Sequence, residues 1–90
     1  SINCDSVNMR ENEIRTITLS FIDSLRHDDV LQTVVAEVTT GITLTFNADE
    51  YQVIYKISST TPSNLEQIKF TAQTAQGNAI IKIVDVVCTV

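Results

Sequence analysis

Side chains branched at Cβ dominate this chain and restrict what it can fold into. Its 90 residues include ten Val, eleven Ile and twelve Thr, so 33 positions are β-branched, whereas there are two Gly and one Pro. Branching at Cβ stiffens χ1 and suits the pleated surface of a β-sheet. The sequence therefore predicts an all-β fold.

The length and the apolar content predict one domain around one core. A chain of this size buries about 65% of its unfolded-state surface, and 43% of its residues are hydrophobic against 19% charged. This balance is typical of a globular domain rather than a disordered tail. We expect the domain to span residues 14–90. Residues 1–13 are polar and weakly patterned, so we expect an N-terminal arm there, with a short edge strand around Ile2 to Val7.

Alternation of apolar and polar residues marks the strands. Ile42, Leu44 and Phe46 alternate with threonines in the clearest example, and a two-residue period is typical of a half-buried strand. Related patterns occur at 16–21, 51–57, 68–73 and 79–90, and polar residues at 22–29, 47–49, 58–64 and 76–78 mark the turns and loops. Six or seven strands with turns about every 8–12 residues predict an immunoglobulin-like antiparallel β-sandwich of about seven strands, or a small barrel.

One segment fits two kinds of structure. The apolar residues at 30, 31, 34, 35 and 38 have spacings that also suit one face of a helix. Four of the nine residues of Val30 to Val38 are valine, however, and Val34, Ala36 and Val38 also alternate. We therefore predict a strand there.

The core is expected to contain one set of large side chains drawn from most of the strands. Tyr51 and Tyr55 lie four residues apart on one predicted strand face, which suits a stacking platform as well as a core, and we interpret both as core residues. The predicted core is Leu19, Phe21, Leu44, Phe46, Tyr55 and Phe70.

The residue types that carry catalysis or bind metals are few, and none forms a recognisable site. His27 is the only histidine and lies in a polar corner, where adjacent side chains of an extended chain diverge and do not surround an ion. Asp49 and Glu50 lack the spacing of a calcium loop, and Asp23 suits a structural hydrogen bond in the corner. We predict no enzyme activity, no catalytic, cofactor-binding or metal-binding residues, and no cofactor.

Charge and hydropathy narrow the partners. The net charge is −5, and no run of Lys and Arg offers a stripe for a phosphate backbone, so we expect no direct binding to nucleic acid. Apolar stretches reach about three residues, far short of the roughly 20 that span a bilayer, so we expect no membrane segment, and we see no signal peptide. A start at Ser1 is compatible with cytoplasmic synthesis followed by removal of an initiator Met.

The two cysteines lie near opposite ends of the chain. First and last strands run side by side in many sandwiches, so a bridge between Cys4 and Cys88 and two free thiols are both open. Free thiols are favoured because the sequence carries no sign of secretion.

The order of the segments resembles the small immunoglobulin-like virion proteins of tailed bacteriophages. The similarity lies in the run from Ile17 to Leu25 (ITLSFIDSL), followed by Asp29-Val30-Leu31, where an Asp and an aliphatic residue open the next strand. It extends over about residues 14–90 and includes a closing hairpin with Gly77 at its tip. It departs at Ser59 to Ser63 (STTPS), where a Gly-Gly phrase is usual.

This resemblance implies a structural virion protein, a capsid decoration or accessory protein on the phage head. The partner would be a capsid or other virion protein, a homo-oligomer is compatible with this role, and the location would be the capsid surface after synthesis in the host cytoplasm. The polar arm Ser1 to Asn12 would order on a neighbouring subunit, and deletion of Ser1 to Asn8 should then spare the fold but weaken attachment to the particle. Two alternatives stay open: a head-tail or tail-associated protein, and a binding module of a cellular adhesin or carbohydrate-binding surface protein.

Overall fold

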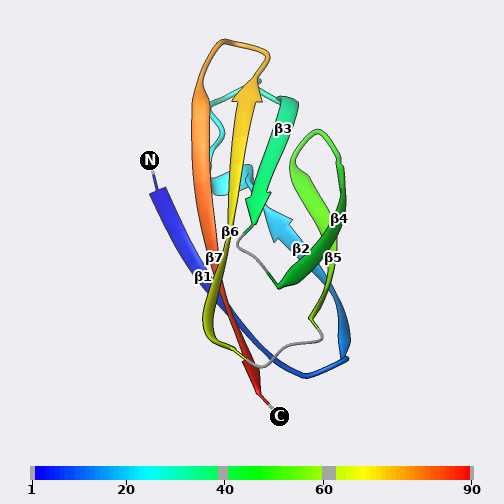
Figure 1. Ribbon diagram of the computed structural model, residues 1–90. Helices are drawn as coiled ribbons and strands as arrows, with labels where there is room; N and C mark the ends of the chain where they lie inside the picture. Colours follow the sequence, from blue (N-terminus) through cyan, green and yellow to red (C-terminus); the bar gives the residue numbers. More distant parts are fainter. Residues whose placement is uncertain (1, 39–40, 60–62, 90) are drawn as a thin grey trace.

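The protein is a sandwich of two β-sheets, seen here in a computed structural model that describes residues 2–38, 41–59 and 63–89 (Figure 1). One sheet has four strands in the order β1-β7-β6-β3, and the other has three in the order β2-β5-β4. The strands are β1 (Ile2–Arg10), β2 (Ile14–Ser20), β3 (Leu31–Val38), β4 (Ile42–Ala48), β5 (Gln52–Ser59), β6 (Ser63–Thr74) and β7 (Ala79–Thr89). The predicted all-β, immunoglobulin-like sandwich of about seven strands is confirmed.

The ambiguous segment at 30–38 is a strand, as predicted. It forms β3, which pairs antiparallel with β6 and has a register shift between Leu31 and Thr33. Its valines favour this outcome, because β-branched side chains lose χ1 freedom in a helix and pack well on a sheet. The loop expected at 58–64 is shorter in the structure, since β5 continues to Ser59 and β6 begins at Ser63, and residues 60–62 lie outside the described ranges.

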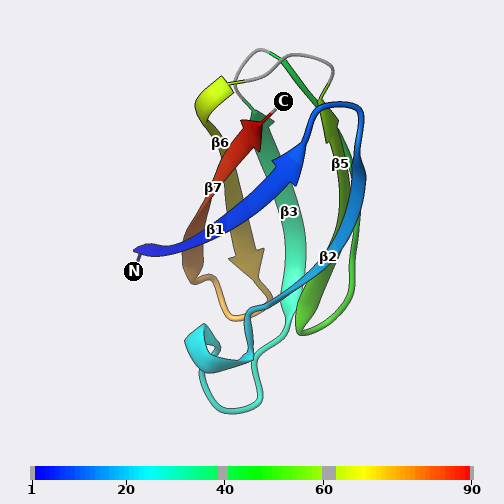
Figure 2. The ribbon, with the colours of Figure 1, turned by 90° about the horizontal axis from the view of Figure 1, so that it is seen from below.

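The sandwich is not wholly antiparallel, which corrects the predicted architecture in one pair. β1 runs parallel to β7, with Ile2 opposite Ile81 and Arg10 opposite Thr89. The N-terminal segment is thus a nine-residue edge strand in the structure (Figure 2). Val7 and Met9 are buried in the common core, so the last part of this strand contributes packing as well as backbone pairing.

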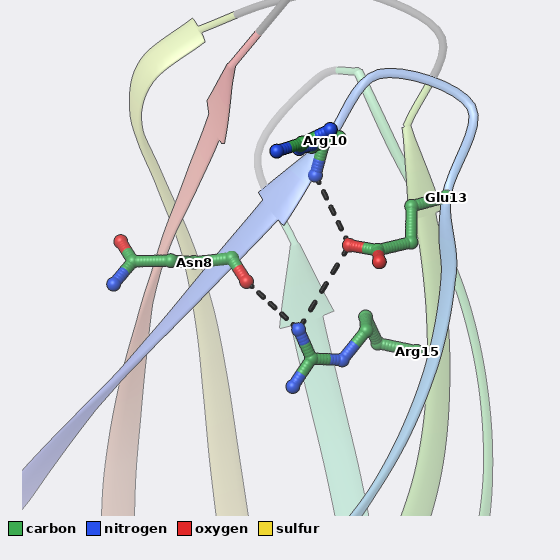
Figure 3. A network of polar contacts seen from close by, with 4 residues as sticks. All are labelled: Asn8, Arg10, Glu13 and Arg15. Carbon is green, nitrogen blue, oxygen red and sulfur yellow. Dashed lines mark hydrogen bonds and ion pairs between the residues drawn. The ribbon is translucent and has the colours of Figure 1, made fainter.

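Hydrogen bonds and an ion pair hold the end of β1 against the start of β2 (Figure 3). The Arg15 guanidinium donates to the carbonyl of Asn8 at 3.0 Å and lies 3.8 Å from the Glu13 carboxylate. The same carboxylate accepts a bond of 3.1 Å from the N–H of Arg10. Because these groups are exposed, each contact contributes little by itself, and their role is to fix the turn that leads from one sheet to the other.

The core joins both sheets through side chains at alternate positions. Leu19, Phe21, Tyr55 and Phe70 are buried as predicted, and the Phe70 ring centroid lies 5.2 Å from that of Tyr55. Leu44 and Phe46 on β4 are half-buried and pack against this cluster. These six residues therefore share one core, with the two β4 residues at its margin.

Tyr51 does not belong to this core, and the prediction that it does is wrong. Tyr51 is 45% exposed and lies in the turn before β5. The backbone carbonyl of Tyr51 accepts a bond of 2.8 Å from the N–H of Phe21. The two-residue period that buries Val53 and Tyr55 does not extend into a turn, because there the chain leaves the pleat.

Cys88 is a buried free thiol, which decides between the alternatives left by the sequence. In the β1–β7 register Cys88 lies opposite Met9, whereas Cys4 lies opposite Ile83. Five residues along a strand correspond to about 16 Å, and a disulfide needs Cα atoms within about 7 Å of each other. The parallel pairing thus keeps the two cysteines apart.

Candidate functional site

Three connections meet at one end of the sandwich and form a surface that we call the loop end. It consists of residues 21–30 between β2 and β3, residues 49–51 between β4 and β5, and residues 75–78 between β6 and β7. These connections lie at the lower end of the view in Figure 2. A short 3-10 helix, η1 (Ile22–Ser24), shapes the first of them.

Backbone hydrogen bonds join the three connections to one another. The N–H of Phe21 donates to the Tyr51 carbonyl at 2.8 Å, which ties the first connection to the second. The N–H of Ala75 donates to the Val30 carbonyl at 3.0 Å, which ties the third to the first. Because backbone groups are satisfied between the loops, their shape is set by the fold and a binding partner would meet a preorganised surface.

Asp29 is the central residue of this arrangement, and it is only 3% exposed. One carboxylate oxygen accepts bonds from the N–H groups of Val30 at 3.0 Å and Gln76 at 3.1 Å. The other accepts a bond of 3.3 Å from the Asn78 amide. Asp29 thereby joins the corner to the β6–β7 hairpin, 47 and 49 residues away in sequence.

The pKa of Asp29 records a competition between burial and hydrogen bonding. Burial raises the pKa of this carboxyl, because it disfavours the charged form. The hydrogen bonds from the Thr74 side chain, the Gln76 N–H, the Asn78 side chain and the Val30 N–H outweigh burial and lower the pKa below its ordinary 3.8. The folded protein therefore holds Asp29 as a carboxylate.

Asp29→Asn is expected to lower the melting temperature at pH 6, by about 5 °C or more, because an amide places a donor where the carboxylate accepts several N–H bonds. A folded pKa below the unfolded value means that the stabilisation is present above about pH 3.8 and is lost as pH falls through the folded pKa. The difference in melting temperature between parent and variant should thus narrow below pH 3.8. Thermal melts from pH 2 to 6 measure it, with the exposed Asp28→Asn as control. A constant difference at all pH values would contradict the role of the Asp29 charge.

The exposed side of the loop end combines apolar and acidic side chains. Ile22 and Tyr51 are 58% and 45% exposed and place two large apolar side chains on this surface. The loop end carries five acidic residues and one basic residue, so −4 of the net charge of −5 lies here. These charged residues are Asp23, Arg26, Asp28, Asp29, Asp49 and Glu50.

A hollow of about 250 Å³ lies beside Asp29, between the corner and the hairpin. Its polar walls include Ser24, Arg26, Thr74 and Asn78. The Asp29 carboxylate beside this hollow already accepts hydrogen bonds from Gln76 and Asn78. These bonds give Asp29 a structural role in joining the corner to the hairpin.

The sequence-derived candidates occupy solvated positions. His27 is almost fully exposed, with Nε2 3.1 Å from a carboxylate oxygen of the equally exposed Asp28. Asp23 is exposed in η1. The corner residue whose carboxylate accepts structural backbone hydrogen bonds is Asp29. Within the described ranges, no group of three His, Cys, Asp or Glu side chains is arranged to hold a metal ion.

Sequence reasoning missed Asp29 and Lys82 because both depend on distant partners. Lys82 is buried in β7, its ammonium donates to the Ser20 carbonyl at 2.7 Å, and it lies 5.0 Å from the centroid of the Phe21 ring. Ile80 and Val84 lie two residues to either side on the same strand face and are buried, but no local pattern shows that the Ser20 carbonyl is available to the Lys82 ammonium. The aliphatic stem of Lys82 is buried while its charged head is satisfied at the margin of the loop end.

Comparisons with known proteins support the fold alone. In the parts of the chain that the structure describes, there is no helix of the length and apolarity needed to cross a membrane. No protein-family model and no curated protein sequence matches the chain. Among solved structures it resembles the crystal structure of a 2,6-sialyltransferase from Vibrionaceae Photobacterium sp. JT-ISH-224 in a ternary complex with CMP and lactose, with a TM-score of 0.60 at 10% identity. The match covers 98% of this chain but 18% of that one, so the likeness concerns a sandwich of this shape.

Proposed function

We propose that this protein is a non-enzymatic structural protein of a tailed-phage virion, a decoration or accessory protein that attaches to the capsid through its loop end. The resemblance of residues 14–90 to such proteins motivates the class of function. The observation that carries the proposal is the loop end itself, where exposed Ile22 and Tyr51 lie on loops fixed by hydrogen bonds.

The geometry of the loop end suits recognition of a protein surface. Preorganised loops lose little conformational entropy on binding, and exposed aliphatic and aromatic side chains supply the apolar contact that dominates interface energies. The acidic residues around Ile22 and Tyr51 favour a partner with a basic patch, since complementary charge speeds encounter and fixes orientation. The expected partner is therefore a capsid protein surface with basic residues around an apolar centre.

A rebinding experiment tests the surface. Purified protein is added to particles that lack it, and bound copies are counted for the parent and for the double variant Ile22→Ser/Tyr51→Ser. Occupancy of the double variant should fall about tenfold or more, because truncated interface anchors typically cost that much affinity. Parent occupancy should also fall as salt rises, because salt screens the attraction between the acidic loop end and a basic patch.

The matched control is Ile14→Ser/Val35→Ser, which removes two apolar side chains that are at least as exposed but lie on strands β2 and β3, outside the loop end. This control should bind like the parent. Equal binding by the loop-end variant, or a loss confined to the control, would exclude the loop end as the attachment surface.

A further inference from the structure

The outer edge of β4 is an unprotected strand edge. Among the described strands β4 is hydrogen-bonded only to β5, and its seven residues (ITLTFNA) contain no charge and no proline. Its register with β5 is continuous from Ile42 to Ala48. Sheet proteins normally block such edges with charges, prolines, bulges or very short strands, because an open edge is a template for pairing with another chain.

The directions of the β4 backbone groups follow from the turn that closes the β4–β5 hairpin. The N–H of Asp49 donates to the Gln52 carbonyl at 2.8 Å, so this pair is hydrogen-bonded. Hydrogen-bonded and non-hydrogen-bonded pairs alternate along an antiparallel ladder. Thr43, Thr45 and Asn47 therefore bond to β5, whereas the N–H and C=O groups of Ile42, Leu44, Phe46 and Ala48 are directed away from it.

We propose that β4 pairs antiparallel with β4 of a second copy of this chain, across a two-fold axis at Thr45. In this register Leu44 of one copy lies opposite Phe46 of the other and Ile42 opposite Ala48, so all four outward residues form hydrogen-bonded pairs. The two three-stranded sheets then become one six-stranded sheet. The half-buried Leu44 and Phe46 gain apolar neighbours across the junction.

The side-chain pattern of β4 is self-complementary in this register. Thr45 lies opposite Thr45 of the other copy, and Thr43 opposite Asn47, all on the exposed face of the sheet. Threonine pairs are favourable cross-strand neighbours. On the inner face every pair is apolar, and no like charges meet within the junction.

Charge distribution favours antiparallel over parallel pairing. The acidic Asp49 and Glu50 follow β4 directly, so they lie beyond its Ala48 end. Antiparallel pairing places this end beside Ile42 of the other copy, which keeps the two loop ends on opposite sides of the assembly. A parallel arrangement would bring two regions of charge −4 together and is disfavoured.

The other sheet edges are less suited to a second copy. β3 carries Glu37 and an irregular register near its start, and β2 carries Arg15. β1 carries Asp5 and Arg10 in its sequence. These are the features that natural sheets use against edge pairing, so β4 is the edge that we assign to association.

A matched pair of double variants tests the assignment. Thr43→Glu/Asn47→Glu places glutamates opposite one another in the proposed junction. The control Ile14→Glu/Thr18→Glu makes the same charge change on β2, at exposed positions opposite the same β5 residues, Ser58 and Ile54. Sedimentation equilibrium from micromolar to millimolar protein should show the parent and the control rising from the 10.0 kDa monomer toward a dimer. The β4 variant should dissociate about tenfold more readily, because two like-charge pairs oppose each other.

Amide hydrogen exchange of the parent tests the same proposal without any variant. The amides of Leu44 and Phe46 should exchange at least about tenfold more slowly at millimolar than at micromolar protein, while the outward amides of Thr16 and Thr18 on β2 stay unchanged. A parent that remains monomeric at millimolar concentration, or a β4 variant that dimerises like the parent, would overturn the proposal. Added salt should strengthen self-association of a chain with a net charge of −5, because it screens the repulsion between copies, whereas it should weaken attachment to a basic partner. The opposite salt dependences distinguish a failure of the β4 dimer from a failure of capsid attachment.

Discussion

Phe70→Ala is expected to lower the free energy of unfolding by about 3–5 kcal/mol, a large part of the roughly 5–15 kcal/mol that stabilises a domain. Phe70 is completely buried on β6, in the middle of the larger sheet. Its ring contacts Tyr55 in the other sheet and meets Phe46 edge-on at 5.9 Å between centroids. Its removal opens a cavity between the sheets, and urea unfolding monitored by circular dichroism measures the cost.

Phe46→Ala provides the comparison for this substitution. The same aromatic group is removed, but Phe46 is half-buried at the margin of the core. The substitution therefore loses less buried apolar surface, and the neighbouring side chains fill the space more easily, so the residual cavity is smaller. The loss of stability should be clearly smaller than for Phe70→Ala. Equal losses would mean that the core is centred nearer β4 than the structure shows.

Deletion of residues 1–10 should destabilise the sandwich by about 3–6 kcal/mol, or abolish folding. It removes the β1–β7 ladder and two buried side chains, Val7 and Met9, each of which contributes about 1.5–3 kcal/mol. This expectation reverses the one from sequence, in which a polar arm is dispensable for folding. Thermal melts of full-length and truncated protein measure the effect.

Single substitutions in β1 separate packing from chain length. Val7→Ala should lower the melting temperature, whereas Asn8→Ala should not, because Val7 is buried while Asn8 is exposed and contributes its backbone carbonyl to Arg15. A truncated chain that melts like the full-length protein would show that β1 is a tether rather than part of the sandwich.

The strands were predictable wherever a period of two coincides with one buried face. Ile42, Leu44 and Phe46 alternate with threonines and form β4, and Ile68, Phe70 and Ala72 alternate on β6 with all three side chains buried. Here the local pattern and the tertiary environment agree, so composition and alternation are sufficient.

The remaining features were not predictable because partners distant in sequence create them. Asp29 stands beside Asp28 in the sequence, yet it is buried by donors on a hairpin about 50 residues later, and Asp28 is exposed. Lys82 faces the core because the Ser20 carbonyl lies within reach of its ammonium. An edge strand around Ile2 to Val7 was predicted, but its extension to Arg10 and its parallel pairing were not, because β7 offers a backbone edge that needs no apolar pattern in β1.

The location of the protein in purified phage particles tests the central claim most directly. Quantitative mass spectrometry of such particles, compared with the lysate of the same infection, gives the copy number of this chain relative to the major capsid protein. A structural virion protein should copurify in a fixed ratio to the capsid protein, and the ratio should survive repeated purification at low salt. A chain that is abundant in the lysate but absent from the particles would contradict the proposed function.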